Sequence, residues 1–183
     1  GNRIHALLMA NNGRLWIGSN DGLHFIDRDG TPQVYAALQQ MRISALYQSA
    51  SGSVWVGTAK NGIFRIDAEA KHHPLPLPES GNQAPWIYDI SEARPGEYWF
   101  ATFGNGILVY NELSGVFKPI RKERMLESNL LDNDVWVLFR DRAGLLWIGT
   151  RTGLNVTNTA LSGLHHIPAG LPGSRLSDGM IYA

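Results

Sequence analysis

The sequence predicts an all-β fold, a β-propeller segment of four four-stranded antiparallel blades. Two observations predict it. Glycine is abundant, with 20 residues in 183, and runs suited to long helices are few, which is typical of β-structure with many tight turns. A tryptophan motif also recurs at spacings of 39, 44 and 48 residues, near the roughly 40 to 50 residues of one blade. The four tryptophans are Trp16, Trp55, Trp99 and Trp147.

Each repeat opens with a short inner strand. Apolar residues stand at both odd and even positions of these runs, which is typical of a strand covered on both faces. The four inner strands are expected at residues 4–8, 43–47, 87–91 and 135–139.

A glycine-containing turn then leads into a second strand, which carries the repeat tryptophan. Glycine supplies the positive φ that a tight hairpin needs, so the first two strands of each repeat are expected to form a hairpin. These turns are at residues 11–13, 50–52, 94–96 and 142–144.

Further turn signals follow each tryptophan strand and predict a third and an outer strand. Proline in the outer strand is tolerated because an edge strand need not donate every backbone hydrogen bond. The third strands are expected at 23–26, 63–66, 107–110 and 154–156, and the outer strands at 33–36, 73–77, 116–120 and 164–167.

The repeats also predict how the blades are arranged. Blades are expected at residues 4–38, 43–79, 87–122 and 135–172, and residues 177–183 match the approach to a fifth inner strand. That extra strand has no place in a closed four-bladed ring. We therefore expect an incomplete arc of a larger propeller of about seven blades, whose exposed apolar blade faces drive self-association.

The repeat tryptophans are expected to form the core between blades, because aromatic side chains bury large areas. A glycine stands two residues after three of them, at Gly18, Gly57 and Gly149. These glycines are expected to make room for the indole.

Two of the repeats resemble a known family. Residues 13–23 (GRLWIGSNDGL) and 144–154 (GLLWIGTRTGL) are similar to the two-component regulator propeller repeat, while the other two repeats depart from it at Tyr98, Phe100 and Ala101. In that family such repeats form the periplasmic or extracellular sensor region of membrane-bound sensor histidine kinases and diguanylate cyclases. The resemblance implies a bacterial extracytoplasmic sensory module that passes its signal to a domain outside this chain.

Composition excludes several classes of partner. Sixteen basic residues balance sixteen acidic ones, so no net field attracts nucleic acid or an anionic membrane. The chain contains no cysteine, which excludes disulfides and thiolate metal sites. Its apolar runs are too short to span a bilayer, and it opens at Gly1 without an initiator methionine, as an excised piece of a larger protein would. We expect no nucleic-acid partner and no direct membrane insertion.

Ligand recognition is expected on one end of the blades. In a four-stranded meander the turns between second and third strands share one end with the connections between blades, and loops on a rigid scaffold commonly carry function. Trp86 and Asn105 are the leading candidates, because they pair a non-repeat aromatic with a polar turn of the same repeat. The other candidates are Phe103, Lys60, Asn61, Arg151, Asn133 and Asp134. Trp136, inside an inner strand, is interpreted as packing.

No group of residues predicts catalysis, a cofactor or a metal. The doublets at 72–73 and 165–166 place neighbouring histidines on opposite faces of a strand, so one metal cannot easily take both. The run at 27–30 resembles a calcium loop, but the required twelfth-position carboxylate is Leu38. The chain itself is therefore expected not to be an enzyme.

Three functional classes remain open. The first is a sensory module for a small extracytoplasmic ligand such as a saccharide, and the second is a docking propeller without a small ligand. The third is a propeller lyase, which would need a polar cluster in the central channel. His5, Tyr88 and Asp89 on the inner strands neither repeat nor pair in the sequence. We favour the first class.

Overall fold

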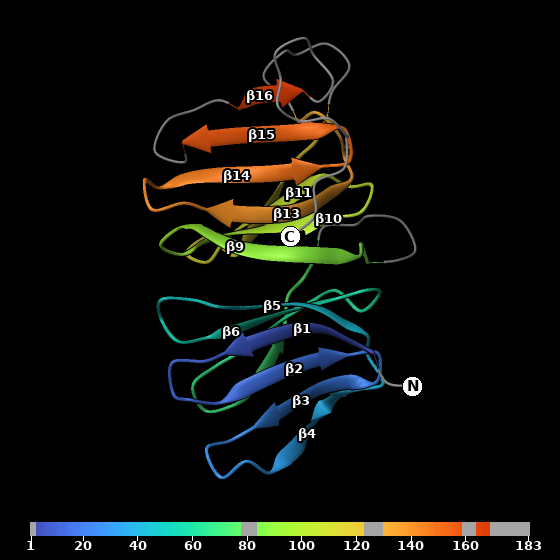
Figure 1. Ribbon diagram of the computed structural model, residues 1–183, viewed down its shortest axis with the longest axis vertical. Helices are drawn as coiled ribbons and strands as arrows, with labels where there is room; N and C mark the ends of the chain where they lie inside the picture. The colour runs from blue at the N-terminus through green and yellow to red at the C-terminus, as the bar shows by residue number, and fades with distance from the viewer. Residues whose placement is uncertain (1–2, 78–83, 123–129, 159–163, 169–183) are drawn as a thin grey trace. The chain divides into compact units, whose positions relative to one another are not determined.

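The computed structural model describes residues 3–77, 84–122, 130–158 and 164–168 (Figure 1). Within these ranges sixteen strands form four antiparallel sheets of four strands, and each sheet follows the order of the sequence. The described residues contain no helix, and hence none that could cross a membrane. The predicted all-β class and four-stranded blades are confirmed.

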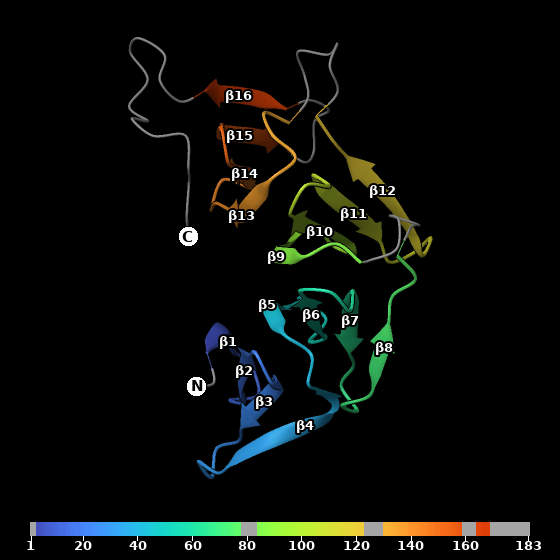
Figure 2. The same cartoon turned by 90° about the vertical axis from the view of Figure 1, so that its right-hand side faces the viewer.

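The chain divides into two compact units, Gly1–Ile87 and Tyr88–Ala183. The first unit holds two blades. Blade 1 comprises β1 (Ile4–Met9), β2 (Leu15–Ser19), β3 (Gly22–Ile26) and β4 (Pro32–Gln39), and blade 2 comprises β5 (Ile43–Gln48), β6 (Val54–Thr58), β7 (Ile63–Ile66) and β8 (His72–Pro74). In Figure 2 each sheet runs from its inner strand, β1 or β5, to its outer strand, β4 or β8.

The second unit holds the other two blades, with β9 beginning at the last residue of the first unit. Blade 3 comprises β9 (Ile87–Arg94), β10 (Glu97–Thr102), β11 (Ile107–Asn111) and β12 (Val116–Ile120), and blade 4 comprises β13 (Val135–Arg140), β14 (Leu145–Thr150), β15 (Gly153–Asn158) and β16 (His165–Pro168). The predicted approach to a fifth inner strand at 177–183 lies outside the described residues. The expected open arc concerns the placement of the two units and stays a prediction.

The outer strand of blade 2 differs from its expected range of 73–77. β8 ends at Pro74, and Leu75 adds one further bond from its N–H to the Ile63 carbonyl at 3.0 Å. Pro74 and Pro76 have no N–H to donate. The ladder therefore ends earlier than the apolar pattern indicates.

Three of the inner strands carry a register shift against their tryptophan strand. It falls between Ile4 and Ala6, between Ile43 and Ala45, and between Val135 and Val137. One residue at each shift is left over from the pairing, as in a β-bulge, and a bulge re-aims the side chain it carries. The extra residues are His5, Ser44 and Trp136.

Two of the motif glycines pack against the isoleucine that begins the next inner strand. A Cβ atom on Gly18 would lie 2.8 Å from Cγ2 of Ile43, and one on Gly57 would lie 2.6 Å from Cγ2 of Ile87. Both isoleucines begin the inner strand of the next blade and are fully buried. At Gly18 and Gly57 the space expected for the indole is taken by these isoleucines, and the expectation for Gly149 stays a prediction.

The joint between blades 3 and 4 has a different pair at the same place. Ala101 replaces the glycine and Val135 replaces the isoleucine, and both belong to one buried cluster. An added methyl group on one side is matched by a smaller side chain on the other, so the total volume is nearly kept.

Two of the repeat tryptophans, Trp16 and Trp99, belong to buried clusters that join neighbouring blades. Trp16, Trp55 and Trp99 are buried, and Trp147 is half-buried. Trp16 packs in one cluster with Val54 and Val56 of blade 2.

The inner strand β1 carries exposed apolar side chains, which differs from the expected coverage of every inner strand on both faces. Ile4, Leu7 and Met9 are 55%, 62% and 64% exposed, whereas their blade 2 counterpart Ile43 is 0% exposed. The core of the first unit lies between blades 1 and 2. Among the described residues of this unit no further sheet covers the other face of blade 1.

Candidate ligand-binding surface

The turns between second and third strands share a hydrogen bond that the sequence analysis missed. The hydroxyl of the residue after the motif glycine or alanine donates to a glycine carbonyl across the turn in all four blades. The pairs are Ser19 to Gly22 at 3.1 Å, Thr58 to Gly62 at 2.8 Å, Thr102 to Gly106 at 2.7 Å and Thr150 to Gly153 at 2.8 Å. The recurrence of Ser or Thr at this place was the signal that could have shown it. These bonds hold the turns in which recognition was predicted.

The segment leading into blade 4, residues 131–134, is hydrogen-bonded to the turn of blade 3 at residues 103–106. The Gly104 N–H donates to Oδ1 of Asp134 at 2.8 Å, and the Gly106 N–H donates to the Asn133 carbonyl at 2.9 Å. The Lys122 N–H donates to Oδ1 of Asn133 at 2.7 Å. Asn133 and Asp134, both predicted ligand contacts, are thus engaged between the two blades.

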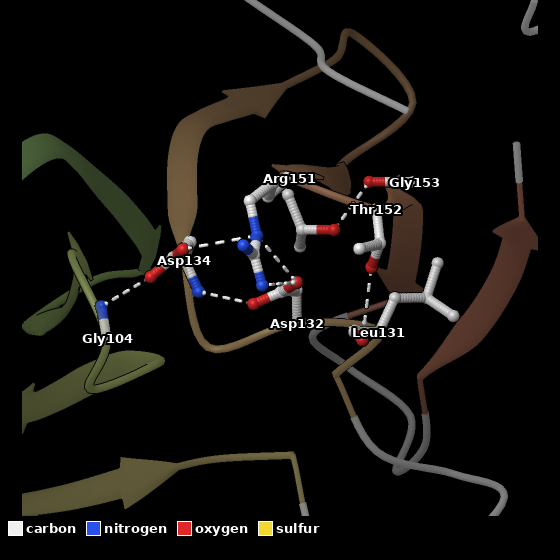
Figure 3. A network of polar contacts seen from close by, with 8 residues as sticks. Gly104, Leu131, Asp132, Asp134, Arg151, Thr152 and Gly153 are labelled. Carbon is white, nitrogen blue, oxygen red and sulfur yellow. Dashed lines mark hydrogen bonds and ion pairs between the residues drawn. The ribbon is translucent and has the colours of Figure 1, made fainter. Parts of the chain in front are cut away.

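The same segment is held on blade 4 by Arg151, another predicted contact (Figure 3). The Arg151 Nε lies 3.2 Å from Oδ2 of Asp132 and 3.3 Å from Oδ2 of Asp134. The Asp134 N–H donates to Oδ1 of Asp132 at 3.0 Å, and the Thr152 hydroxyl donates to the Leu131 carbonyl at 3.2 Å. The Arg151 side chain is 57% exposed, so water screens these ion pairs and each contributes little to stability.

Three aromatic side chains meet beside this network, and we call them the aromatic surface: Tyr88, Phe103 and Trp136. The ring centroids of Tyr88 and Trp136 lie 4.6 Å apart, and those of Phe103 lie 6.2 Å from Tyr88 and 6.4 Å from Trp136. Phe103 is 51% exposed, and the other two are half-buried. The surface therefore offers rings to solvent at the end of the blades where recognition was predicted.

Sequence reasoning named only one member of the aromatic surface. Phe103 was a predicted contact, whereas Trp136 was interpreted as packing and Tyr88 as an isolated inner-strand residue. Both follow the first apolar residue of an inner strand, Ile87 or Val135. That shared position was the available signal.

The predicted pair of Trp86 and Asn105 falls on the two different units. In the first unit the Arg42 guanidinium carbon lies 4.5 Å from the Trp86 ring centroid. In the second unit the Asn105 amide donates to the Phe103 carbonyl at 3.4 Å. Their joint role in recognition stays a prediction.

The two remaining predicted contacts lie on the turn between β6 and β7. Lys60 and Asn61 are exposed, and the Asn61 N–H donates to the Thr58 hydroxyl at 2.8 Å.

Asp89 joins the inner strands of blades 3 and 4. Its Oδ2 accepts the Leu138 N–H at 2.7 Å, and its Oδ1 accepts the Ile90 N–H at 2.8 Å. Burial raises the pKa of this carboxyl to about 6, although both hydrogen bonds lower it. Both oxygens are engaged by backbone donors, which is the arrangement of a structural carboxylate.

The histidine doublet on β8 divides between two environments. His73 Nε2 lies 2.7 Å from Oδ2 of Asp67, whereas the His72 ring packs 6.4 Å from the rings of both Tyr35 and Phe64. The two imidazoles therefore have different neighbours. Within the described part of the chain, no group of three or more His, Asp or Glu side chains is placed to hold a metal ion.

A shallow cavity of about 270 Å³ lies on blade 3, toward the opposite end from the aromatic surface. It is formed on one sheet, and its charged members are Glu97 and Lys118. Its lining is completed by Val109, Asn111, Ser114 and Val116.

Comparison with known proteins identifies the repeats. The family model described as two component regulator propeller matches residues 1–21 and 129–152. The chain is thus similar to the two component regulator propeller repeat over these two stretches. The matched ranges contain the whole tryptophan strand of blade 1 and that of blade 4, and they include Asp132, Asp134 and Arg151.

Other proteins resemble the chain over more of its length. A protein named histidine kinase P4 from Formosa agariphila is 33% identical over 70 residues, which are 38% of this chain and 5% of that kinase. The extracellular domain of a putative hybrid two component system from B. thetaiotaomicron superposes with a TM-score of 0.78 at 21% identity, over 98% of this chain and 24% of that one. A streptogramin B lyase superposes with a TM-score of 0.71 at 16% identity, over 90% of this chain and 54% of that one. These two structures share the fold of the chain, and the match to the kinase spans 5% of the length of that kinase.

Proposed function

We propose that this chain is an extracytoplasmic sensory module of a bacterial signalling protein, and that it binds a small ligand of the saccharide class. The aromatic surface is the observation that carries the proposal. Regulator propeller repeats and the likeness to a histidine kinase support the signalling role. The likeness to an extracellular domain supports a periplasmic or extracellular location. The signal passes to a domain outside these residues.

The chemistry of the aromatic surface suits a sugar. Sugars present apolar C–H faces that pack on aromatic rings, while their hydroxyls bind polar groups at the rim. Phe103 offers an exposed ring, and Asn105 lies in the same turn. Arg151 brings a guanidinium with more than half of its side chain in solvent to the same end of the unit.

We further propose that binding proceeds without turnover. The inner-strand carboxylate Asp89 is engaged by two backbone N–H groups, and His5 on β1 lies 2.7 Å from the amide oxygen of Asn20. Neither is paired with a second titratable group in the manner of a catalytic acid and base. A lyase reaction would need such a pair.

The test is binding of a panel of neutral and acidic oligosaccharides to the 183-residue chain, measured by calorimetry. We expect one class to bind, and Phe103→Ala to weaken it by about tenfold, the loss of roughly 1.4 kcal/mol of stacking. Phe139→Ala is the matched control, because Phe139 is 61% exposed on β13 outside the aromatic surface.

Two results would contradict the proposal. One is equal binding by the Phe103→Ala and unchanged chains. The other is an absence of binding across the panel, which would favour the docking alternative. Product formation from any bound sugar would contradict binding without turnover.

A further inference from the structure

The turn that carries Phe103 is held by Thr102 of its own blade and also by contacts from the segment that enters blade 4. Gly104 and Gly106 have φ angles of +74° and +72°, a region in which L side chains are strained. Such a turn has many accessible conformations in isolation, and its position is set by what binds its backbone. Its two glycine N–H groups are bound by Asp134 and Asn133 of the segment entering blade 4.

We infer that Asp134 is a positioning residue of the aromatic surface, and that it holds the Phe103 ring against Trp136. Asp134 precedes Trp136 by two residues, while its side chain reaches Gly104, the residue after Phe103. One carboxylate thus connects the backbones that carry two of the three rings. The consequence for ligand affinity rests on the proposed function, whereas the positioning itself does not.

The carboxylate is itself held in place from blade 4. Its Oδ1 accepts the Gly104 N–H while its Oδ2 faces Arg151 at 3.3 Å, and only 14% of the side chain is exposed. The Asp134 backbone is fixed by Oδ1 of Asp132 and by the Arg151 N–H, which donates to the Asp134 carbonyl at 3.0 Å. The position of the blade 3 turn therefore depends on the Asp134 side chain, which Arg151 of blade 4 orients (Figure 3).

Asp132 provides a matched comparison within the same network. It pairs with the same Arg151, at 3.2 Å, and is also largely buried. Its hydrogen bonds to Asp134 and Arg151, however, lie within blade 4 and its entering segment. Removing either carboxylate takes one negative charge from Arg151, but only the loss of Asp134 releases Gly104.

The test is amide hydrogen exchange of the 183-residue chain, measured by NMR without ligand. We expect Asp134→Ala to speed exchange at Gly104 by about tenfold, because the acceptor of that N–H is lost. Asp134→Asn retains an oxygen acceptor and should restore most of the protection. Asp132→Ala should leave Gly104 within about threefold of the unchanged chain. The Gly115 amide, bonded at 2.8 Å to the Asn111 carbonyl in a turn at the other end of blade 3, shows whether the change is confined to the Phe103 turn.

The inference is overturned if Asp134→Ala leaves exchange at Gly104 unchanged, or if Asp132→Ala speeds it equally. It is also overturned if exchange at Gly104 and at Gly115 changes equally, because the effect is then not specific to the Phe103 turn. Should Asp134→Ala fail to fold, Asp134→Glu keeps the charge, displaces the carboxylate and carries the same expectation.

A second readout separates this inference from the proposed function. If a saccharide binds, Asp134→Ala should weaken it by about fivefold, and the effect should vanish in a chain that already carries Phe103→Ala. If no saccharide binds, the proposed function fails, and the exchange experiment still decides whether Asp134 positions the turn.

Discussion

At the scale of single residues, the joints between blades depend on matched volumes. Gly57 leaves space for Ile87, and a Cβ atom there would lie 2.6 Å from the isoleucine Cγ2 and 2.8 Å from its Cβ. The joint between blades 3 and 4 has nearly the same total side-chain volume, with alanine in place of glycine and valine in place of isoleucine. The property that repeats is therefore the sum of two side-chain volumes.

This matching predicts the outcome of a double mutant. Gly57→Ala should lower the free energy of unfolding by about 1 to 3 kcal/mol, because overpacking a filled site forces side chains from their positions. Adding Ile87→Val should recover part of that loss, since the smaller side chain can retreat from the new methyl group. Urea denaturation followed by circular dichroism measures both. A double mutant at least as unstable as the sum of its single mutants would show that the volumes are not coupled.

At the scale of strands, the inner strands of blades 3 and 4 are joined by the Asp89 carboxylate. Its pKa in the folded chain is raised to about 6, mainly by desolvation. Between about pH 4 and pH 6 the folded chain therefore retains a proton that the unfolded chain has released. Because the folded state binds more protons in this window, stability falls as the pH rises through it.

Asp89→Asn should remove that pH dependence, which is expected to amount to about 2 to 3 kcal/mol between pH 4 and pH 6.5. Stability measured in urea across this range provides the check. Asp141→Asn is the control, because the hydrogen bond from the Trp147 indole N–H lowers the pKa of Asp141 and confines its contribution to more acidic solutions. The same slope in the Asp89→Asn and unchanged chains would assign the pH dependence to other groups.

At the scale of the whole molecule, the apolar residues of β1 predict association. Ile4, Leu7 and Met9 are each more than half exposed on one strand, and contiguous apolar surface of this kind drives proteins together. We expect the 183-residue chain to show an average mass above that of a monomer at concentrations of about 10 to 100 μM in sedimentation equilibrium.

Replacing Ile4, Leu7 and Met9 together with threonine should lower that mass toward the monomer value. Val34 on β4 and Leu113 in the turn after β11 are the control positions, because they are 49% and 98% exposed but lie away from β1. Threonine at both control positions should leave the mass unchanged. A monomeric chain with β1 intact would argue that this face does not cause association.

The sequence alone was sufficient to predict the fold class and the order of hairpins. Glycine turns and strand alternation act over a few residues, so a repeated local pattern reports a repeated local structure. Two features differ from the prediction: β8 ends early, and β1 has exposed apolar side chains. Proline limited the first, and the second depends on which sheet lies beside β1.

Contacts between distant residues were decided by the tertiary structure. Gly57 and Ile87 are 30 positions apart, as are Gly104 and Asp134, and no local pattern states which residue will occupy a space or accept an N–H. For the same reason Asn133, Asp134 and Arg151 resembled free polar side chains in the sequence, although Asp134 pairs with Arg151 and Asn133 accepts the Lys122 N–H. The aromatic surface likewise exists because two inner strands and one turn meet. Strand periodicity is a property of one segment, whereas a binding surface is a property of the packing of several.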